Sequence, residues 1–312
     1  MDTEHWASYH RSGALISCPT NPEPYYTMEV HDSWERFFSG LVDGDRVLDL
    51  GTGNGPVALI AKETADSHSW HYEIDAVDVA DIDPHKFVPD GARLLKGIRF
   101  HGGVKCEDLP FDNQQFDAIS GQYILEYTDK HKTMAECARV MVPGARCQFI
   151  LHHLDSVIVR NALQSLQEVD LVVDTEAIPK FRDYCETVSG SAGGAQQARA
   201  ALYEVGETLQ AAANEAQNPL ILRFVIDYVS ALLARRSQMR SGELQRETVR
   251  LETEFESWAR RLRDLASAAV SQEEMDALVE MANASGFFAV ETGEQFQADQ
   301  VVGWRLTMFR SR

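Results

Sequence analysis

Short apolar runs alternate with amphipathic segments through the first half of the chain. Apolar runs predict strands at 46–50, 72–79, 98–106, 116–120 and 145–152. Helical patterns cover 29–38, 56–64 and 129–141, and the last is expected to end at Pro143 and Gly144. Strands that alternate with helices predict a parallel sheet with helices on its faces. Ligands bind such sheets beyond the carboxyl ends of the strands, so site residues are expected there.

The pattern changes after residue 153. Residues 154–270 predict a helical insertion, with helices at 156–173, 220–235 and 243–269, an alanine-rich stretch at 195–216 and a flexible joint at 189–194. Residues 271–312 predict a helix that starts at a Ser271–Glu274 capping box, followed by strands at 287–296 and 301–309. The insertion fits a lid that shapes an acceptor site, a packing cap or a dimer interface, and the pattern does not choose among them.

Composition narrows the class of protein. The 312 residues are 44% hydrophobic and 25% charged, as in ordinary globular proteins. The net charge of −19 disfavours nucleic acid as a partner. No apolar run reaches the roughly 18 residues of a membrane span, and the N-terminus lacks the apolar segment of a secretory signal. Five scattered cysteines without a C-x-x-C motif fit a reducing cytoplasm and argue against a disulfide scaffold.

A glycine-rich turn follows the first predicted strand. Gly51, Gly53 and Gly55 allow a sharp turn and a close approach of the backbone to a ligand. Their spacing is neither the dinucleotide G-x-G-x-x-G nor a P-loop. Asp49, just before the turn, would repel a pyrophosphate but suits an ammonium group. A plain glycine turn without a ligand is the alternative.

Asp78 ends the second predicted strand. An acidic residue at this position can accept hydrogen bonds from both hydroxyls of a ribose. Val79 would then lie against an adenine ring. Asp81 and Asp83 follow closely and are interpreted as a solvated acidic loop, so no metal site is predicted.

Four segments in order then resemble class I S-adenosylmethionine-dependent methyltransferases that act on small molecules. They are VLDLGTGNG (47–55), AVDVAD (76–81), CEDLPFDNQQFDAISGQYILEY (106–127) and ECARVMVPGARCQFILHH (136–153). The resemblance implies a Rossmann-like sheet of seven mostly parallel strands, with helices on both faces and the last strand beside the fifth. It implies a cofactor-binding core at 46–153, completed by 271–312 and covered by a helical segment at 1–45. S-adenosylmethionine would be the cofactor and S-adenosylhomocysteine the product.

The resemblance also implies the cofactor contacts. The glycines would surround the methionine part, Asp49 its amino group, Asp78 the ribose and Val79 the adenine. The full implied set is Asp49, Gly51, Thr52, Gly53, Gly55, Asp78, Val79, Cys106, Glu107, Gln122 and Tyr26. In this set Cys106 and Glu107 border the adenine edge, Gln122 passes beside the sulfonium, and Tyr26 or Tyr25 touches the carboxylate. Lys105-Cys106 stands where the family often has Asp-Ala, so a backbone contact to adenine is expected there.

Methyl transfer from a sulfonium mainly requires alignment of the acceptor. An oxygen or acidic-carbon acceptor also needs a base, and His152 or His153 is expected to supply it, with Tyr123 as a further candidate. Neighbours in a strand point to opposite faces, so at most one histidine faces the site. The alternative is that both simply form hydrogen bonds at the strand end.

The predicted function is methyl transfer to a small, moderately apolar metabolite in a biosynthetic or tailoring pathway. The partner is therefore a small-molecule acceptor, with no nucleic acid and no membrane, and a homodimer through the insertion is possible. Asn-Pro-Pro-Tyr, typical of members that methylate amide or amine nitrogens, is absent after the fourth strand. Two alternatives keep the cofactor site: a reaction without methyl transfer, such as cyclisation, and a catalytically silent regulatory dimer.

Overall fold

The computed structural model describes residues 3–16, 26–187, 192–239 and 242–311. The chain divides into two compact units, Met1–Arg160 with Asp264–Arg312, and Asn161–Arg263. Among the described residues, no helix has the length and apolar character needed to cross a membrane.

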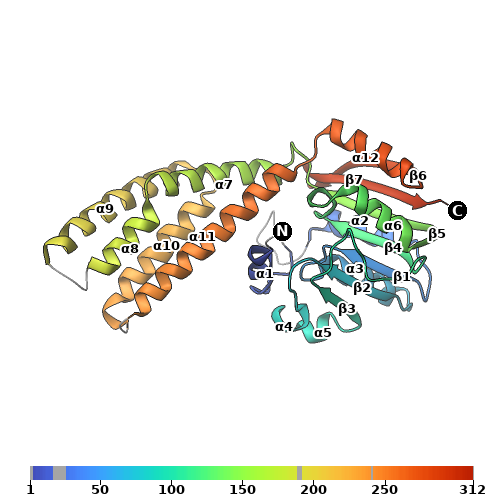
Figure 1. Cartoon of the computed structure of the whole chain (residues 1–312), viewed down its shortest axis with the longest axis horizontal. Coiled ribbons are helices and arrows are strands. Elements are labelled where there is room, and N and C mark those ends of the chain that lie inside the picture. The colour runs from blue at the N-terminus through green and yellow to red at the C-terminus, as the bar shows by residue number, and fades with distance from the viewer. Residues whose placement is uncertain (1–2, 17–25, 188–191, 240–241, 312) are drawn as a thin grey trace. The chain divides into compact units, whose positions relative to one another are not determined.

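The first unit is built on a seven-stranded sheet with the order β3-β2-β1-β4-β5-β7-β6 (Figure 1). The parallel strands are β1 (Arg46–Leu50), β2 (Glu73–Asp78), β3 (Ile98–Gly102), β4 (Phe116–Gln122) and β5 (Met141–Leu151). The antiparallel strand β7 (Gln300–Arg310) lies between β5 and β6 (Phe287–Gln297). This topology confirms the predicted mostly parallel, Rossmann-like sheet, including the last strand beside the fifth.

The central strands are buried on both faces, which explains their nearly continuous apolar sequence. In β1, only Arg46 is partly exposed, and Asp49 is buried with the three apolar residues. Register places Leu50 beside Val77 of β2 and Gly121 of β4. The segments that follow β1, β2 and β4 therefore all begin at the carboxyl ends of neighbouring parallel strands, on the same side of the sheet.

Helices cover both faces of the sheet. On one face, α6 (Lys130–Val140) and α12 (Gln272–Ala284) share an apolar core with the sheet. On the other, α2 (Met28–Phe38) packs against α3 (Pro56–Ser67). The predicted Ser271–Glu274 capping box starts α12. Four shorter elements, which the sequence reasoning did not place, are α1 (Glu4–His10), α4 (Pro84–Phe87), α5 (Gly91–Leu94) and the 3₁₀ helix η1 (Leu125–Tyr127).

Two predicted strand limits were wrong by four residues, and β4 ends two residues later than predicted, at Gln122. β5 begins at Met141, directly after α6, and runs through Pro143 and Gly144 instead of starting after them. A bulge opposite Phe116 and Ala118 of β4 accommodates the proline, which has no N–H for the ladder. β3 ends at Gly102, because the next two backbone N–H groups donate to the carbonyls of Ala80 and Asp78.

The second unit is helical. The insertion between β5 and β6 carries α7 (Val157–Asp174), α8 (Ala177–Thr187), α9 (Ala192–Glu215), α10 (Leu220–Arg235), the 3₁₀ helix η2 (Arg236–Gln238) and α11 (Glu243–Ala268). It has its own apolar core, which includes Phe181, Ile221 and Leu251. The buried Glu168 carboxylate accepts hydrogen bonds from the Ile221 and Leu222 N–H groups at the start of α10. Of the predicted flexible joint at 189–194, residues 189–191 lie outside the described residues, and 192–194 are instead the first residues of α9.

Candidate active site

The glycine turn after β1 has a backbone that only glycine adopts easily. Gly51, Gly53 and Gly55 have φ values of 59°, 52° and 84°. Neighbouring side chains also fill the space beside each of them. A Cβ at Gly53 would lie 2.7 Å from the His10 ring, and one at Gly55 would lie 2.7 Å from Phe100. The turn therefore ends β1 and starts α3 without room for side chains.

Asp49 lies beneath this turn with both carboxylate oxygens engaged. Oδ2 accepts a hydrogen bond from the Thr52 hydroxyl at 2.6 Å, and Oδ1 accepts one from the Ser120 hydroxyl at 2.7 Å. Only 1% of the residue is exposed. Burial raises the pKa of Asp49 to about 7, although the two hydroxyl donors act in the opposite direction. The carboxyl group is therefore balanced between its neutral and charged forms near neutral pH.

Asp78, at the end of β2, links the glycine turn to the next loop. Its Oδ2 accepts from the Gly53 N–H and its Oδ1 from the Ala80 N–H, both at 2.8 Å. These bonds fix the orientation of the carboxylate. Because a carboxylate has about four lone-pair positions, each oxygen can accept one more hydrogen bond. Val79, the next residue, is half-buried.

The loop after β3 returns to the same end of the sheet. The Val104 N–H donates to the Asp78 carbonyl at 2.9 Å. Cys106 follows in the apolar core, and burial raises the pKa of its thiol well above the usual value. Glu107 is half-buried and accepts a hydrogen bond from the Asp129 N–H. Cys106 therefore lies close enough to Asp78 to interact with it electrostatically, whereas the Glu107 side chain is bonded to the backbone at Asp129.

Gln122, at the end of β4, is oriented by α2. Its Oε1 accepts a hydrogen bond from Trp34 Nε1 at 2.6 Å. Its Nε2 is buried and has no hydrogen-bond partner among the described residues. Tyr26 is half-buried just before α2, and its predicted neighbour Tyr25 lies outside the described residues.

His152, directly after β5, forms a buried pair with Glu126 of η1. Glu126 Oε1 lies 2.8 Å from both the backbone N and the Nδ1 of His152. Glu126 was considered from sequence only as a residue near the acceptor. Because a carboxylate only accepts hydrogen bonds, we assign the imidazole proton to Nδ1 and the lone pair to Nε2. This contact fixes the orientation of the imidazole ring, and a carboxylate at this distance can stabilise the protonated form of the ring.

Tyr123 supports the same imidazole. Its ring stacks on His152 with centroids 4.1 Å apart. Its φ of 55° is uncommon for a bulky residue and is held by a hydrogen bond from its N–H to the Ile150 carbonyl. Its hydroxyl donates to the Val302 carbonyl of β7 at 3.0 Å. Tyr123 thus directs its hydroxyl proton to the backbone and its ring to His152.

His153 contacts different residues. Its ring stacks on Trp304 with centroids 4.2 Å apart, and its Nδ1 accepts from the Asp155 N–H at 3.0 Å. Its Nε2 lies 3.6 Å from Glu294. The structure therefore brings His152, and not His153, into contact with Tyr123 and Glu126.

The N-terminal helix α1 packs onto the glycine turn. The His10 ring faces Gly53, and the Asn54 amide donates to the His10 carbonyl at 2.9 Å. The Trp6 ring lies 6.3 Å from both His10 and Tyr127, and Tyr127 lies 5.9 Å from His152. A series of rings thus connects the glycine turn to His152. Trp6 and His10 are four residues apart, so both rings lie on one face of α1, and this spacing could have indicated their contact from the sequence.

The acidic loop after β2, which contains Asp81 and Asp83, is not assigned as a metal site. Asp81 and Asp83 are exposed, as interpreted from the sequence. Elsewhere in the described part of the chain, one group has the spacing of metal ligands: His31, Asp32 and Glu35 of α2, whose ligand atoms lie within 4.8 Å of one another. These side chains are all partly exposed, so the cluster is an ordinary solvated helix surface.

Part of the chain is similar in sequence to known proteins. Residues 48–149 match a sequence family described as a methyltransferase domain. The chain is 31% identical over 132 residues to the ubiquinone/menaquinone biosynthesis C-methyltransferase UbiE of Xanthomonas oryzae, covering 40% of this chain and 50% of that protein. It is 34% identical over 126 residues to UbiE of Vibrio vulnificus, covering 38% and 46%. The chain thus spans about half the length of the curated relatives that it matches.

Among solved structures, the chain is similar to an S-adenosylmethionine-dependent methyltransferase from Mesorhizobium loti. The identity is 21%, the TM-score is 0.31, and 38% of this chain and 52% of that one are covered. The matched residues begin within β1, at Leu48, and include Asp49, the glycine turn, β2 with Asp78, and β4. Residues 48–149 are therefore similar in sequence to a methyltransferase domain.

Proposed function

We propose that this chain transfers the methyl group of S-adenosylmethionine to a small, moderately apolar metabolite. One observation carries the proposal. The Gly53 N–H of the glycine turn donates a 2.8 Å hydrogen bond to Asp78, and both residues lie in the range that matches a methyltransferase domain. This bond brings the two predicted cofactor motifs, 25 residues apart, to one end of the sheet.

The residues present fit the cofactor. When bound, S-adenosylmethionine supplies an activated methyl group on a positively charged sulfur. Asp78 offers one free acceptor position on each oxygen, which suits two neighbouring ribose hydroxyls. Asp49 offers a negative charge for an ammonium group, with Thr52 and Ser120 holding the carboxylate in place. The roles of Val79, Cys106, Glu107, Gln122 and Tyr26 stay predictions.

We assign His152 the role of base. Glu126 holds the proton on Nδ1, so Nε2 accepts a proton from a hydroxyl or an acidic carbon of the acceptor. The imidazolium that forms is stabilised by the buried Glu126 carboxylate. General-base catalysis of this kind typically contributes about 10²–10⁴-fold to the rate.

The aromatic residues around His152 support a planar, apolar acceptor. Tyr123 and Tyr127 contact the imidazole, and Trp6 contacts Tyr127. The relatives from Xanthomonas and Vibrio are named as C-methyltransferases of ubiquinone and menaquinone biosynthesis. We therefore infer an aromatic acceptor with an ionisable hydroxyl, methylated on that oxygen or on the ring carbon beside it.

Calorimetric titration with S-adenosylmethionine and S-adenosylhomocysteine tests the cofactor site. The variant Asp78→Asn keeps the shape of the side chain but loses its charge and one acceptor oxygen, and we expect at least tenfold weaker binding. Asp81→Asn removes the same charge from the exposed loop three residues later and serves as the matched control. Equal affinities of wild type and Asp78→Asn would contradict the proposed ribose contact.

A labelled methyl group then distinguishes the possible reactions. With S-adenosylmethionine labelled in the methyl group and a panel of hydroxylated aromatic compounds, we expect the label in the product together with S-adenosylhomocysteine. Cofactor consumption without label transfer would favour another reaction such as cyclisation, and binding without turnover would favour a regulatory role. Dimerisation through 154–270 and a cytoplasmic location stay predictions, and light scattering tests the first.

A further inference from the structure

A hollow of about 300 Å³ lies between α2 and the strands β5, β7 and β6. Its lining includes three arginines, Arg36, Arg146 and Arg305, and the polar residues Ser33, Gln148 and Thr307. Arg146 and Gln148 belong to the middle of β5, whereas His152 follows its end. This hollow is therefore lined by residues other than those of the proposed active site.

Strand register explains why these side chains meet. Gln148 lies beside Thr307, and Arg146 beside Phe309. Because side chains alternate along a strand, these residues share one face of the sheet, together with Arg305. The intervening Cys147 and Phe149 point to the opposite face, into the core shared with α6 and α12.

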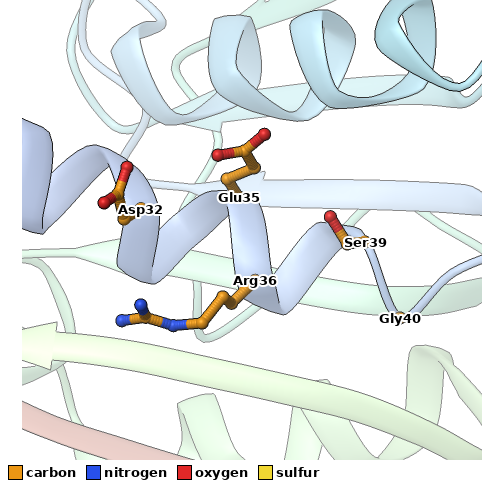
Figure 2. A pocket seen from close by; sticks show the side chains of 5 residues that line it. All are labelled: Asp32, Glu35, Arg36, Ser39 and Gly40. Atoms are coloured by element: carbon orange, nitrogen blue, oxygen red, sulfur yellow. The ribbon is translucent and has the colours of Figure 1, made fainter.

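The arginines make this hollow positive in a chain whose net charge is −19. Glu291 is the one carboxylate among the described lining residues. Arg36 and Arg305 form no ion pair with any residue in the described ranges. In Figure 2 the side chains of Arg36 and Glu35 extend to opposite sides of α2, although both residues and Asp32 line another hollow beside the helix.

Arg146 is held in a fixed orientation. Its Nη1 donates to the Phe37 carbonyl at 2.8 Å. Its guanidinium carbon lies 5.8 Å from the centroids of both the Phe37 and Phe309 rings. The guanidinium is therefore held at the wall of the hollow, where it packs beside Gly40 and interacts electrostatically with the carboxylate of Asp45.

Two buried polar groups, the Gln148 NH₂ and the Ser33 hydroxyl, belong to residues that line this hollow. Gln148, 4% exposed, accepts a hydrogen bond from the Thr307 hydroxyl on Oε1, which places its NH₂ group on the other side of the amide. Neither Gln148 Nε2 nor the Ser33 hydroxyl has a hydrogen-bond partner among the described residues. A buried donor without a partner is unfavourable, and an anion would accept hydrogen bonds from both groups.

We propose that this hollow binds a small anion that carries phosphate or carboxylate groups. Guanidinium groups match both, because their paired N–H donors can bind two oxygens at once. Gln148 and Ser33 would complete the set of donors from the floor, while the hollow is large enough for a compact metabolite and too small for a folded partner.

Calorimetric titrations with pyrophosphate, inorganic phosphate and citrate test the site, each at constant ionic strength set with sodium chloride. We expect saturable binding of at least one of these probes to one site per chain, and the arms separate phosphate from carboxylate ligands. Arg36→Gln with Arg305→Gln should weaken binding at least tenfold. Absence of saturable binding by the wild type at millimolar concentrations of all three probes would overturn the proposal.

Two further variants separate a site from general attraction of anions. Arg199→Gln with Arg223→Gln removes the same charge from exposed helix positions in the second unit and should change the affinity less than twofold. Glu291→Gln removes the carboxylate from the hollow and should tighten binding. Equal losses in both arginine pairs, or weaker binding by Glu291→Gln, would overturn the proposal.

A measurement on the wild-type protein covers the case in which the arginine variants do not fold. Phenylglyoxal modifies exposed guanidinium groups, and peptide mass spectrometry locates the modified residues. The anion that binds should slow modification of Arg36 and Arg305 at least threefold and leave Arg199 unchanged. Equal protection of all three arginines, or none, would contradict a site in this hollow.

Discussion

The buried carboxyl group of Asp49 gives a quantitative test of the proposed site. We consider Asp49→Asn, which keeps the size and shape of the side chain and removes its charge. The amide can still accept a hydrogen bond from one of the two hydroxyls, Thr52 or Ser120, and can donate to the other, because a hydroxyl also accepts. The main change is therefore the loss of a buried titratable group.

The sign of the stability change follows from the raised pKa of Asp49. The pKa is about 7 in the folded protein and 3.8 in a solvated carboxyl group. Between these pH values the folded chain binds more protons than the unfolded chain, so the free energy of unfolding decreases as the pH rises. The full decrease corresponds to roughly 4 kcal/mol, of which roughly 2 kcal/mol falls between pH 5.5 and pH 8.5.

Urea unfolding of the first unit at these two pH values measures the difference. We expect Asp49→Asn to gain about 2 kcal/mol relative to wild type between pH 5.5 and pH 8.5. Asp83→Asn, in the exposed loop after β2, is the matched control and should show a constant difference. A constant difference for Asp49→Asn as well would refute the assignment of a raised pKa to this group.

Asp49→Asn should gain stability relative to wild type at high pH, but it should bind the cofactor more weakly there. If the charged Asp49 holds an ammonium group, the wild type should bind S-adenosylmethionine about tenfold more weakly at pH 6 than above pH 8, because a tenth of the carboxyl groups remain charged. Asp49→Asn should bind weakly at both pH values. A variant that is more stable at high pH and binds as tightly as wild type would show that Asp49 does not contact the cofactor.

Three other substitutions separate positioning from chemistry. Glu126→Gln should lower kcat at least tenfold and leave cofactor affinity within twofold, because it disturbs the proton on His152 but not the glycine turn; an unchanged kcat in a methyl-transfer assay would contradict the proposed base. Tyr123→Phe keeps the stacked ring and loses one hydroxyl, so stability should fall by about 0.5–1.5 kcal/mol in urea unfolding and activity less than threefold. Loss of activity in this variant would identify the hydroxyl as catalytic instead. Gly53→Ala should destabilise the protein more than Gly44→Ala, since both have positive φ but only Gly53 faces a close side chain. Equal changes in melting temperature would argue against crowding at the turn.

Much of the fold could be predicted because its signals are local. The five residues of β1 and the sixteen of α10 occupy the predicted ranges. The capping box of α12 needs only Ser271 and Glu274, one turn apart. The start of β5 was wrong because Pro143 and Gly144 normally end an element, and only the partner strand shows that a bulge accepts them.

In the proposed site, too, residues marked by local sequence pattern could be predicted, and contacts between distant residues could not. Asp49, the glycines and Asp78 follow strands directly, so the sequence pattern was enough to select them. The Glu126–His152 pair joins residues 26 positions apart, and the Trp34–Gln122 hydrogen bond joins residues 88 apart. Such contacts depend on which strands are neighbours and on how the following loops return, and hydrophobic periodicity contains neither.

The positive charge of the arginine-lined hollow could not be predicted from the net charge of the chain. The net charge of −19 argues against a nucleic-acid partner because a long polyanion interacts with the whole surface. A small anion in a hollow is different, since salt screens charges beyond about 8 Å and the nearest groups dominate. Arg36, Arg146 and Arg305 come from three elements that are far apart in sequence and meet only in the folded sheet. An acidic protein can therefore repel nucleic acid and still bind a phosphate- or carboxylate-bearing metabolite, because the two interactions depend on different sets of its charges.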